Sequence, residues 1–231
     1  MANENDAQKI KKPIKKEVNN DIYHTLRKLI LDGALAGGAP LRQDDIAEQF
    51  GVSKIPVREV FRKLESDGLV EFRPRRGVFV TEHTEAEILE MLEIRIALES
   101  RALELSIPQM TDLDIELARE ILKEYEEVEG IEVWSDLNRR FHDCIYAPCG
   151  LMNLISMIHS VVDRTGSFMR LKVTMASGFD RPHSEHVDIL KACEAGDVDK
   201  GVDLLRKHIE RTKKEVAAHF RRQSLSILSS S

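Results

Sequence analysis

Aromatic residues are scarce in this chain, at 5% of 231 residues, and cysteine is scarcer still. The three cysteines, Cys144, Cys149 and Cys193, show no CxxC spacing, which excludes a disulfide framework and a thiolate zinc site. No run approaches about 18 consecutive apolar residues, which excludes a membrane-spanning helix. The polar N-terminus lacks the apolar segment of a secretory signal. We therefore expect a soluble, cytoplasmic protein with no membrane partner.

The overall composition favours helices, and the chain divides into two parts that differ in charge. Hydrophobic residues make up 42% and charged residues 32%, with few of the β-branched and aromatic runs typical of sheets. Residues 1–80 hold 15 basic and 12 acidic side chains, whereas residues 81–231 hold 19 basic and 28 acidic ones. A basic first part joined to an acidic second part suggests two functions, the first facing a polyanion.

The first part reads as three helices followed by a hairpin. After a disordered tail over 1–16, apolar residues from Val18 recur at helical spacing until Gly33. A glycine-rich turn over 33–41 leads to a short helix over 44–50. Ser53, whose hydroxyl can accept from a first-turn amide, is the expected N-cap of the third helix. Two β-rich runs, 69–73 and 78–80, flank a Pro/Gly turn and predict a hairpin.

The second part has helical periodicity throughout. Thr84 followed by Glu87 is a capping-box signature, which marks the start of its first helix. We expect helices over 84–106, 111–128, 132–147, 150–174, 184–195 and 198–222. The fold class is therefore mainly α, with an N-terminal winged helix-turn-helix over 17–82 and an all-helical bundle over 84–222. Residues 223–231 read as a frayed tail.

A winged helix-turn-helix places its third helix in the major groove, with N-terminal side chains at base edges. Lys54, Arg58 and Arg62 are spaced to share one face of that helix, opposite its apolar residues. The hairpin tip adds three arginines, a composition that suits phosphates or a narrow minor groove. The predicted DNA-binding residues are Ser53, Lys54, Arg58, Arg62, Arg75, Arg76 and Gly77. The alternative is a solvated helix face whose basic side chains pair with Glu59 and Glu65.

The run from 40 to 80 resembles the DNA-binding domain of GntR-type bacterial transcription regulators. GVSKIPVRE (51–59), LESDGLV (64–70) and RRGVFV (75–80) carry that resemblance most specifically. Lys54 stands where the family usually has Arg, and Ile55 where Thr is common, which implies an altered base preference. Asp44 occupies a position that is basic in some members, so no phosphate contact is assigned to it. The resemblance implies a homodimer on double-stranded DNA with a short inverted repeat.

Three histidines of the second part lie on three different predicted helices. His142, His186 and His208 can converge inside a bundle and bind a divalent metal through neutral nitrogens. Asn138 precedes His142 by four residues and shares its helix face. The alternative is that these are ordinary surface or core histidines, as we expect of His159, His183 and His219.

Residues 84–222 resemble the FCD effector domain of the FadR branch of the GntR family. Many members hold a metal there with an acidic residue, a His four later and two further His. Those positions fall on Asn138, His142, His186 and His208, so the resemblance implies a divalent metal such as zinc or nickel. Asn138 departs from the pattern, because an amide oxygen is a neutral and weaker ligand.

Arg95, in EIRIALES (93–100), matches a family arginine near the effector pocket. It can bind a carboxylate bidentately, or it can pair with Glu99 one turn later. The expected function is a ligand-responsive transcription regulator, most often a repressor, which senses a small organic acid and is not an enzyme. The alternatives are an architectural DNA-binding dimer without an effector and, from another class, a metal-dependent hydrolytic enzyme.

Overall fold

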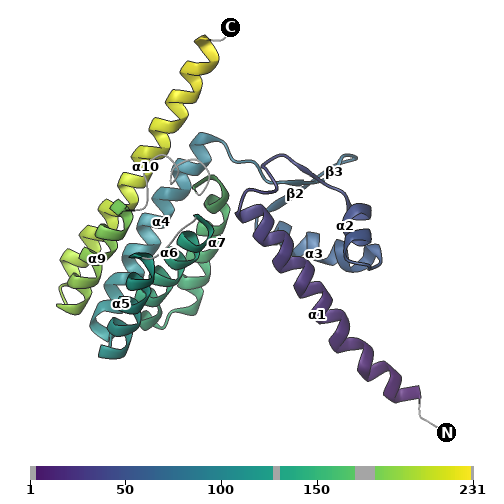
Figure 1. Ribbon diagram of the computed structural model, residues 1–231, viewed down its shortest axis with the longest axis horizontal. Helices are drawn as coiled ribbons and strands as arrows, with labels where there is room; N and C mark the ends of the chain where they lie inside the picture. Colours follow the sequence, from purple (N-terminus) through teal and green to yellow (C-terminus); the bar gives the residue numbers. More distant parts are fainter. Residues whose placement is uncertain (1–3, 127–130, 170–179, 230–231) are drawn as a thin grey trace. The chain divides into compact units, whose positions relative to one another are not determined.

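The computed structural model describes residues 4–126, 131–169 and 180–229, and it confirms the predicted fold class (Figure 1). The chain divides into two compact units, Met1–His83 and Thr84–Ser231. Among the described residues, no helix combines the length and apolar character needed to cross a membrane.

The first unit is a three-helix motif with a small antiparallel sheet. Its elements are α1 Glu4–Leu31, β1 Pro40–Leu41, α2 Gln43–Gln49, α3 Lys54–Ser66, β2 Val70–Arg73 and β3 Gly77–Val80, and its strand order is β1-β3-β2. The hairpin of β2 and β3 confirms the sequence prediction. Strand β1 was not expected within the turn over 33–41. Leu41 pairs with Val78 and is buried, so a non-local partner makes this segment extended.

The core of the first unit lies between α1, α3 and the sheet. Ile22 and Leu26 of α1 are almost fully buried, as are Val57, Phe61 and Leu64 of α3. Both sets recur at helical spacing, so each helix presents one apolar face to the other. Each large side chain that leaves water contributes about 1.5–3 kcal/mol. This packing holds α3 with its opposite, charged face in solvent.

Helix α1 begins at Glu4, within the segment 1–16 for which the sequence predicts a disordered tail. Pro13 suggested a break, but the surrounding stretch is rich in lysine, with five lysines from Lys9 to Lys16. These residues have high helix propensity, which favours continuation of the helix toward the N-terminus.

The second unit is all-helical in its described part. Its elements are α4 Glu85–Ser106, η1 Ile107–Gln109, α5 Asp112–Glu126, α6 Ile131–Tyr146, η2 Ala147–Cys149, α7 Met152–Met169, α9 Asp180–Glu194 and α10 Val198–Ser229. Helix α4 packs against α10, α7 and α6, whereas α9 packs against α10 and α5. The core residues of α4 include Leu92 and Leu103, which are fully buried. Helix α4 is therefore the central element of the bundle.

The start of α4 confirms the capping box. The Thr84 hydroxyl accepts from the Glu87 amide, and the Glu87 carboxylate accepts from the Thr84 amide. Two helix ends differ from the prediction. Helix α9 begins at Asp180 rather than Ser184, with Pro182 in its first turn, where the missing N–H costs nothing. Helix α10 continues to Ser229, so the frayed tail predicted over 223–231 is helical as far as that residue.

Four expected features lie wholly or partly outside the described residues. These are the last residues of the helix expected over 111–128, the break at Gly130, the last residues of the helix expected over 150–174, and the first part of the break expected over 177–182. The breaks near Pro108 and Pro148 are present as the short 3-10 helices η1 and η2.

Candidate functional sites

The N-terminal half of α3 presents basic side chains to solvent. Lys54, Arg58 and Arg62 are all exposed, each one helical turn after the last. Pro56 and Val57 are buried on the opposite side. Ser53 stands at the N-cap position with extended backbone angles, but its side chain makes no capping hydrogen bond. The predicted capping role of the Ser53 hydroxyl is therefore wrong, and this hydroxyl is exposed at the helix start instead.

The alternative of a neutralised helix face finds little support in the contacts. Glu59 accepts a hydrogen bond of 2.8 Å from the side-chain amide of Asn19 in α1. Lys54 pairs with Asp44 of α2, 2.7 Å away, and both are exposed. Within the described part of the chain, Arg58 and Arg62 form no ion pair. Their guanidinium groups remain available to an external anion.

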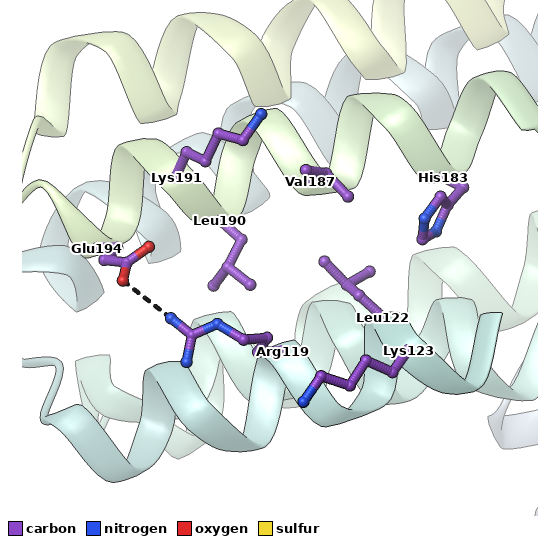
Figure 2. Close-up of a pocket in the computed structure, with 8 residues that line it drawn as sticks. All are labelled: Arg119, Leu122, Lys123, His183, Val187, Leu190, Lys191 and Glu194. Carbon is purple, nitrogen blue, oxygen red and sulfur yellow. Dashed lines mark hydrogen bonds and ion pairs between the residues drawn. The ribbon is translucent and has the colours of Figure 1, made fainter. Parts of the chain in front are cut away.

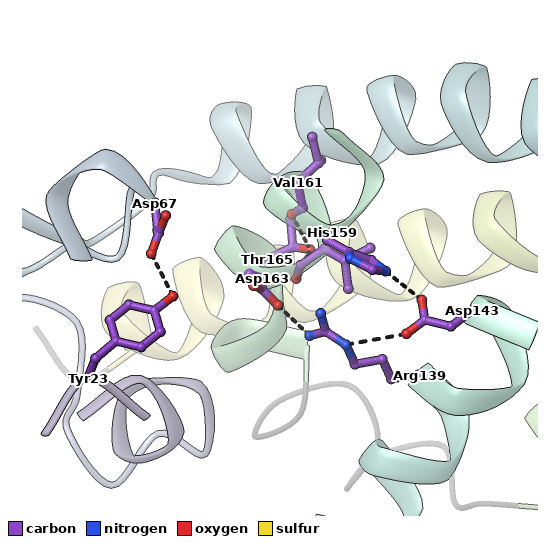
Figure 3. Close-up of polar contacts among 9 residues, drawn as sticks. Tyr23, Asp67, Arg139, Asp143, His159, Val161, Asp163 and Thr165 are labelled. Atoms are coloured by element: carbon purple, nitrogen blue, oxygen red, sulfur yellow. Dashed lines mark hydrogen bonds and ion pairs between the residues drawn. The ribbon is translucent and has the colours of Figure 1, made fainter. Parts of the chain in front are cut away.

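A contact between α1 and the end of α3 holds α3 in place. The Tyr23 hydroxyl donates a hydrogen bond of 2.7 Å to Asp67, just past the end of α3 (Figure 3). Lys63 of α3 places its ammonium 3.6 Å from the centroid of the same ring. These contacts fix the orientation of α3, and they therefore also fix the orientation of its exposed basic face.

The hairpin tip carries two exposed arginines and a glycine. Arg73 faces Gly77 across the ladder, and Arg75 lies between them with a positive φ of 61°. Gly77 has φ 103°, a conformation that favours glycine, and its role in DNA binding stays a prediction. The guanidinium groups of Arg73 and Arg76 lie 4.5 Å and 5.6 Å from the centroid of the Phe79 ring.

Of the three arginines at this tip, Arg73 is paired within its own strand. Its Nε donates a hydrogen bond of 2.7 Å to the Glu71 carboxylate on the same strand. Arg75 and Arg76 are exposed and form no ion pair among the described residues. In the described part of the chain, the hairpin of β2 and β3, which is the wing of the motif, therefore presents two unpaired arginines, Arg75 and Arg76, rather than three.

The three predicted histidines of the second unit do come together. His142 of α6, His186 of α9 and His208 of α10 each offer a ring nitrogen, and these atoms all lie within 4.8 Å of one another. The ring centroids of His142 and His186 are 4.9 Å apart, and those of His186 and His208 are 4.7 Å apart. His186 is fully buried, and the His208 side chain is 11% exposed. The cluster therefore lies in the interior of the bundle.

A buried chain of hydrogen bonds connects this cluster to α4. The Tyr146 hydroxyl donates to Glu99 Oε2 at 2.8 Å, and His142 Nδ1 lies 3.1 Å from the same hydroxyl. Because the hydroxyl hydrogen is used on Glu99, its oxygen accepts from Nδ1–H of His142. The lone pair of His142 is then on Nε2, and that nitrogen is buried without a hydrogen-bond partner.

His208 is held in the same tautomer by a different carboxylate. Its Nδ1 lies 2.7 Å from Oε2 of Glu185 in α9, and Arg211 of α10 pairs with the other carboxylate oxygen. A carboxylate only accepts, so Nδ1 of His208 is the donor and Nε2 carries the lone pair. Metal-ligating histidines commonly donate their second ring N–H to such a carboxylate, which orients the ring.

The histidine cluster fits a divalent metal by the chemistry of its donors. Both ring nitrogens of His186 and Nε2 of His142 are buried without a hydrogen-bond partner, and such orphaned atoms are costly unless something binds them. Burial lowers the pKa of His142 to about 3, against the opposing effect of Glu99, and lowers the pKa of His186 well below its ordinary value. Both rings are therefore neutral at pH 7, which is the form that coordinates metals.

Asn138 and Arg95 are the two other residues predicted for the site in the second unit. Asn138 is half-buried on α6, one turn before His142, and its role as a ligand stays a prediction. Arg95 donates from Nε to Glu99 at 2.6 Å, and both side chains are buried. The ion pair expected as the alternative for Arg95 is therefore present. It leaves the terminal guanidinium nitrogens without a described hydrogen bond, so the effector role of Arg95 stays a prediction as well.

The histidines outside the cluster have structural contacts. His159 of α7 lies 2.7 Å from Asp143 of α6, and Arg139 reaches Asp163 of α7 at 2.6 Å (Figure 3). These contacts tie α6 to α7 at a half-exposed position. His183 packs against the ring of Tyr125, with centroids 5.6 Å apart.

A shallow groove of about 250 Å³ lies between α5 and α9 (Figure 2). Leu122, Val187 and Leu190 form its apolar floor, and Arg119 crosses it to pair with Glu194 at 2.9 Å. None of the three clustered histidines lines this groove. It is separate from the candidate metal site.

Sequence reasoning missed three side chains that complete the histidine cluster. Tyr146 follows His142 by four residues, so the shared helix face was a signal that could have found it. Glu185 gave no such signal for His208 or Arg211, because it reaches both of them from the neighbouring helix α9. Only the packing of α9 against α10 brings them together.

Comparison with known proteins places both units in one family. A model of the bacterial regulatory proteins of the gntR family matches residues 19–80, and a model of the FCD domain matches residues 90–211. The chain belongs to the GntR family. As in other GntR proteins with this arrangement, the exposed face of α3 and the wing form part of a helix-turn-helix unit, and the chain is a DNA-binding transcription regulator.

Relatives of this GntR protein include HTH-type transcription regulators. It is 29% identical over 203 residues to the uncharacterized HTH-type regulator YdhC of Bacillus subtilis, covering 86% of this chain and 85% of that protein. It is 27% identical over 205 residues to the HTH-type repressor RspR of Escherichia coli, covering 86% and 89%.

Solved structures of GntR proteins share the fold. A family member from Pseudomonas syringae is 29% identical, with a TM-score of 0.56 over 90% of this chain and 88% of that chain. McbR/YncC of E. coli is 24% identical, with a TM-score of 0.76 over 89% and 98%. The metal-free FCD domain of TM0439 is 19% identical, with a TM-score of 0.53 over 61% and 99%.

Proposed function

We propose that this GntR protein is a cytoplasmic, homodimeric repressor that binds a short inverted repeat and responds to a small carboxylate through a bound divalent metal. The observation that carries the sensing role is the buried cluster of His142, His186 and His208, with orphaned ring nitrogens on two of the three. A bundle that served only to dimerise would gain more from apolar side chains at these positions.

Three histidines hold the metal in this proposal, and the Asn138 side-chain oxygen adds a fourth donor. Zinc and nickel both suit imidazole ligands. When bound, the metal supplies a Lewis-acidic position that a carboxylate oxygen can occupy. Tyr146 and Glu185 orient the rings of His142 and His208, so that their Nε2 lone pairs face the cluster.

Arg95 serves the same ligand from the neighbouring helix α4. Its Nε is used on Glu99, whereas the terminal nitrogens are free to donate to a carboxylate. Glu99 thus holds the guanidinium plane in one orientation. Because four helices contribute to this site, a ligand bound there favours one arrangement of α4, α6, α9 and α10 over others. A ligand that binds one arrangement more tightly shifts the population toward it, and operator affinity changes accordingly.

Elemental analysis of the purified full-length chain tests the metal. We expect close to one zinc or nickel per chain, and a lower melting temperature after chelation. Replacement of His142, His186 or His208 by Ala should lower occupancy and remove the stabilisation that added metal gives, because a metal bound only by the folded state stabilises it. His159→Ala is the matched control and should retain the metal.

A thermal-shift screen of carboxylic acids, followed by operator binding with each hit, tests the sensing role. We expect at least one acid to raise the melting temperature and to change operator affinity. If neither metals nor acids shift the melting temperature, the sensing role fails and an architectural DNA-binding dimer becomes the better account. Turnover by zinc-loaded protein would instead favour the enzyme.

A further inference from the structure

The N-terminal half of α1 lies outside the core of the first unit. In the described part of the chain, the side chains of α1 that pack into this core run from Val18 to Leu31. Figure 1 shows the earlier turns of the helix extending past the other elements of the unit. Residues 9–16, the lysine segment, hold no acidic residue and five lysines: Lys9, Lys11, Lys12, Lys15 and Lys16. Since these turns do not build the core, packing does not explain this concentration of positive charge.

The five lysines fall on one side of the helix. Successive residues of an α-helix are rotated by about 100° around its axis, so the five positions span an arc of about 160°. Ile10, Ile14 and Glu17 fall on the opposite side. The lysine segment is therefore basic along one side only, an arrangement that suits an extended anionic partner.

This basic side continues into the contact between α1 and α3. Three of the lysines precede Asn19 by seven, four and three residues, so they share one face of α1 with it. The side-chain amide of Asn19 donates a hydrogen bond of 2.8 Å to Glu59 of α3, at an exposed position. The basic side of α1 is therefore the side that is turned toward α3.

The order of the contacts gives the direction in which α1 runs along α3. Tyr23 reaches Asp67, just past the end of α3. Asn19, one turn earlier in α1, reaches Glu59 in the middle of α3. Followed toward its N-terminus, α1 therefore runs toward the N-terminal half of α3, where Arg58 is exposed. The lysine segment comes next along that line, so its basic side adjoins the basic face of α3.

We propose that the lysine segment is a second DNA-binding surface, which contacts phosphates beside the groove that α3 enters. A lysine ammonium is a point charge on a flexible stem, and it suits phosphates better than base edges. The surface therefore adds affinity for duplex DNA of any sequence, whereas α3 supplies the choice of sequence. This inference goes beyond the helix-turn-helix contacts and does not depend on the metal site.

Salt titration of DNA binding tests the proposal. Full-length protein is titrated against a fluorescent duplex of arbitrary sequence, and anisotropy gives the affinity at a series of salt concentrations. In one variant all five lysines become Gln, a residue that keeps a high helix propensity. Each phosphate contact contributes about 0.9 to the slope of log affinity against log salt, so the slope should become shallower by about two to four for each chain bound. The affinity should fall about tenfold or more at low salt. The melting temperature should stay unchanged, because the segment lies outside the core.

Two control variants separate position from total charge. The first changes five exposed lysines of the second unit to Gln and should keep the wild-type slope; these are Lys123, Lys191, Lys200, Lys207 and Lys214. The second exchanges residues within the lysine segment, Ile10→Lys with Lys12→Ile and Ile14→Lys with Lys15→Ile. This exchange keeps the composition but removes the single basic side, so the slope should become shallower by about one or two.

The outcomes decide between this surface and its alternatives. Equal slopes for the five-lysine variant and the wild type would overturn the proposal. An equal loss in the second-unit variant would also overturn it, because total charge would be the cause. An unchanged slope in the exchange variant would show that the basic side of the helix does not bind. Loss of binding to phosphatidylserine vesicles, with DNA binding retained, would assign the segment to a membrane surface instead. If the wild type binds no duplex, the DNA-binding function itself fails, and the proposal fails with it.

Discussion

His208 and Glu185 lie on neighbouring helices, and a hydrogen bond of 2.7 Å joins Nδ1 of the histidine to Oε2 of the carboxylate. Arg211, on the same helix as His208, holds the other oxygen of Glu185. The carboxylate therefore fixes the tautomer of His208 while its own charge is balanced by the arginine. The same arrangement recurs on the other side of the cluster, where Tyr146 links His142 to the Glu99–Arg95 pair.

Removal of the Tyr146 hydroxyl should weaken both the fold and metal binding. Tyr146→Phe leaves a buried acceptor on Glu99 and a buried donor on His142, so we expect a loss of about 1–3 kcal/mol in the free energy of unfolding. Because the ring of His142 loses its orienting partner, metal affinity should fall about tenfold. Urea denaturation and competitive metal titration measure the two effects.

Tyr125→Phe is the matched control for Tyr146→Phe. The Tyr125 hydroxyl is buried and forms no hydrogen bond among the described residues, so its removal should leave stability unchanged or raise it. Equal effects of the two substitutions would show that the Tyr146 hydroxyl has no special role.

Acid should destabilise the metal-free protein through its buried histidines. Burial lowers the pKa of His142 to about 3, whereas an unfolded histidine titrates near 6.5. Between pH 3 and pH 6.5 the unfolded state binds more protons than the folded state. The stability that neutral His142 contributes is therefore fully present above pH 6.5 and is lost as pH falls toward 3. His186, whose pKa is also lowered by burial, acts in the same direction.

The expected slope is about 1.4 kcal/mol per pH unit for each of these two histidines, below pH 6.5. Urea denaturation at pH 7.5, 6.5 and 5.5, with chelator present, measures it. His142→Gln should reduce the slope, because it removes one of the two buried groups that bind a proton only on unfolding. A free energy of unfolding that stays constant between pH 6.5 and 5.5 would contradict the prediction.

Operator recognition should depend on Arg58 more than on the wing. Arg58 is exposed on the outer face of α3 and has no described ion-pair partner. A base-edge contact contributes about 1–3 kcal/mol, so Arg58→Ala should weaken operator binding about tenfold or more and relax specificity. Fluorescence anisotropy with operator and scrambled duplexes measures both. Unchanged operator affinity would show that Arg58 does not contact the base edges.

Arg75 at the hairpin tip should behave differently. A phosphate contact carries no sequence information, so Arg75→Ala should lower affinity for operator and scrambled DNA alike. The slope of log affinity against log salt should become shallower by about one. Arg101→Ala, an exposed arginine of α4 paired with Glu104, is the control and should change neither quantity.

The second unit should carry the dimer contacts. We expect a fragment of residues 84–231 to sediment as a dimer at micromolar concentration and residues 1–83 to sediment as a monomer. A dimer holds two DNA-binding units together, and both can bind the paired half-sites of one operator. The dimer therefore binds the operator more tightly than a single unit does. A monomeric second fragment, or a dimeric first one, would place the contacts elsewhere.

Local patterns in the sequence determined much of this protein. The spacing of Val57, Phe61 and Leu64 implied which face of α3 is buried, and hence that Arg58 and Arg62 are exposed. Thr84 and Glu87 implied the start of α4. These features depend on residues within about one or two helical turns, where the geometry of the backbone alone decides which side chains are neighbours. The family resemblance added the positions of the three histidines.

Only the tertiary structure decided how these pieces meet. Strand β1 exists because Leu41 finds Val78, and the histidines form a cluster because α6, α9 and α10 pack around a shared interior. The neutralisation of Glu185 by Arg211 likewise joins residues 26 positions apart. Such contacts depend on how helices pack, which no local periodicity encodes. The three histidines of the cluster could thus be named from the sequence, whereas their convergence and the charges around them came from the packing.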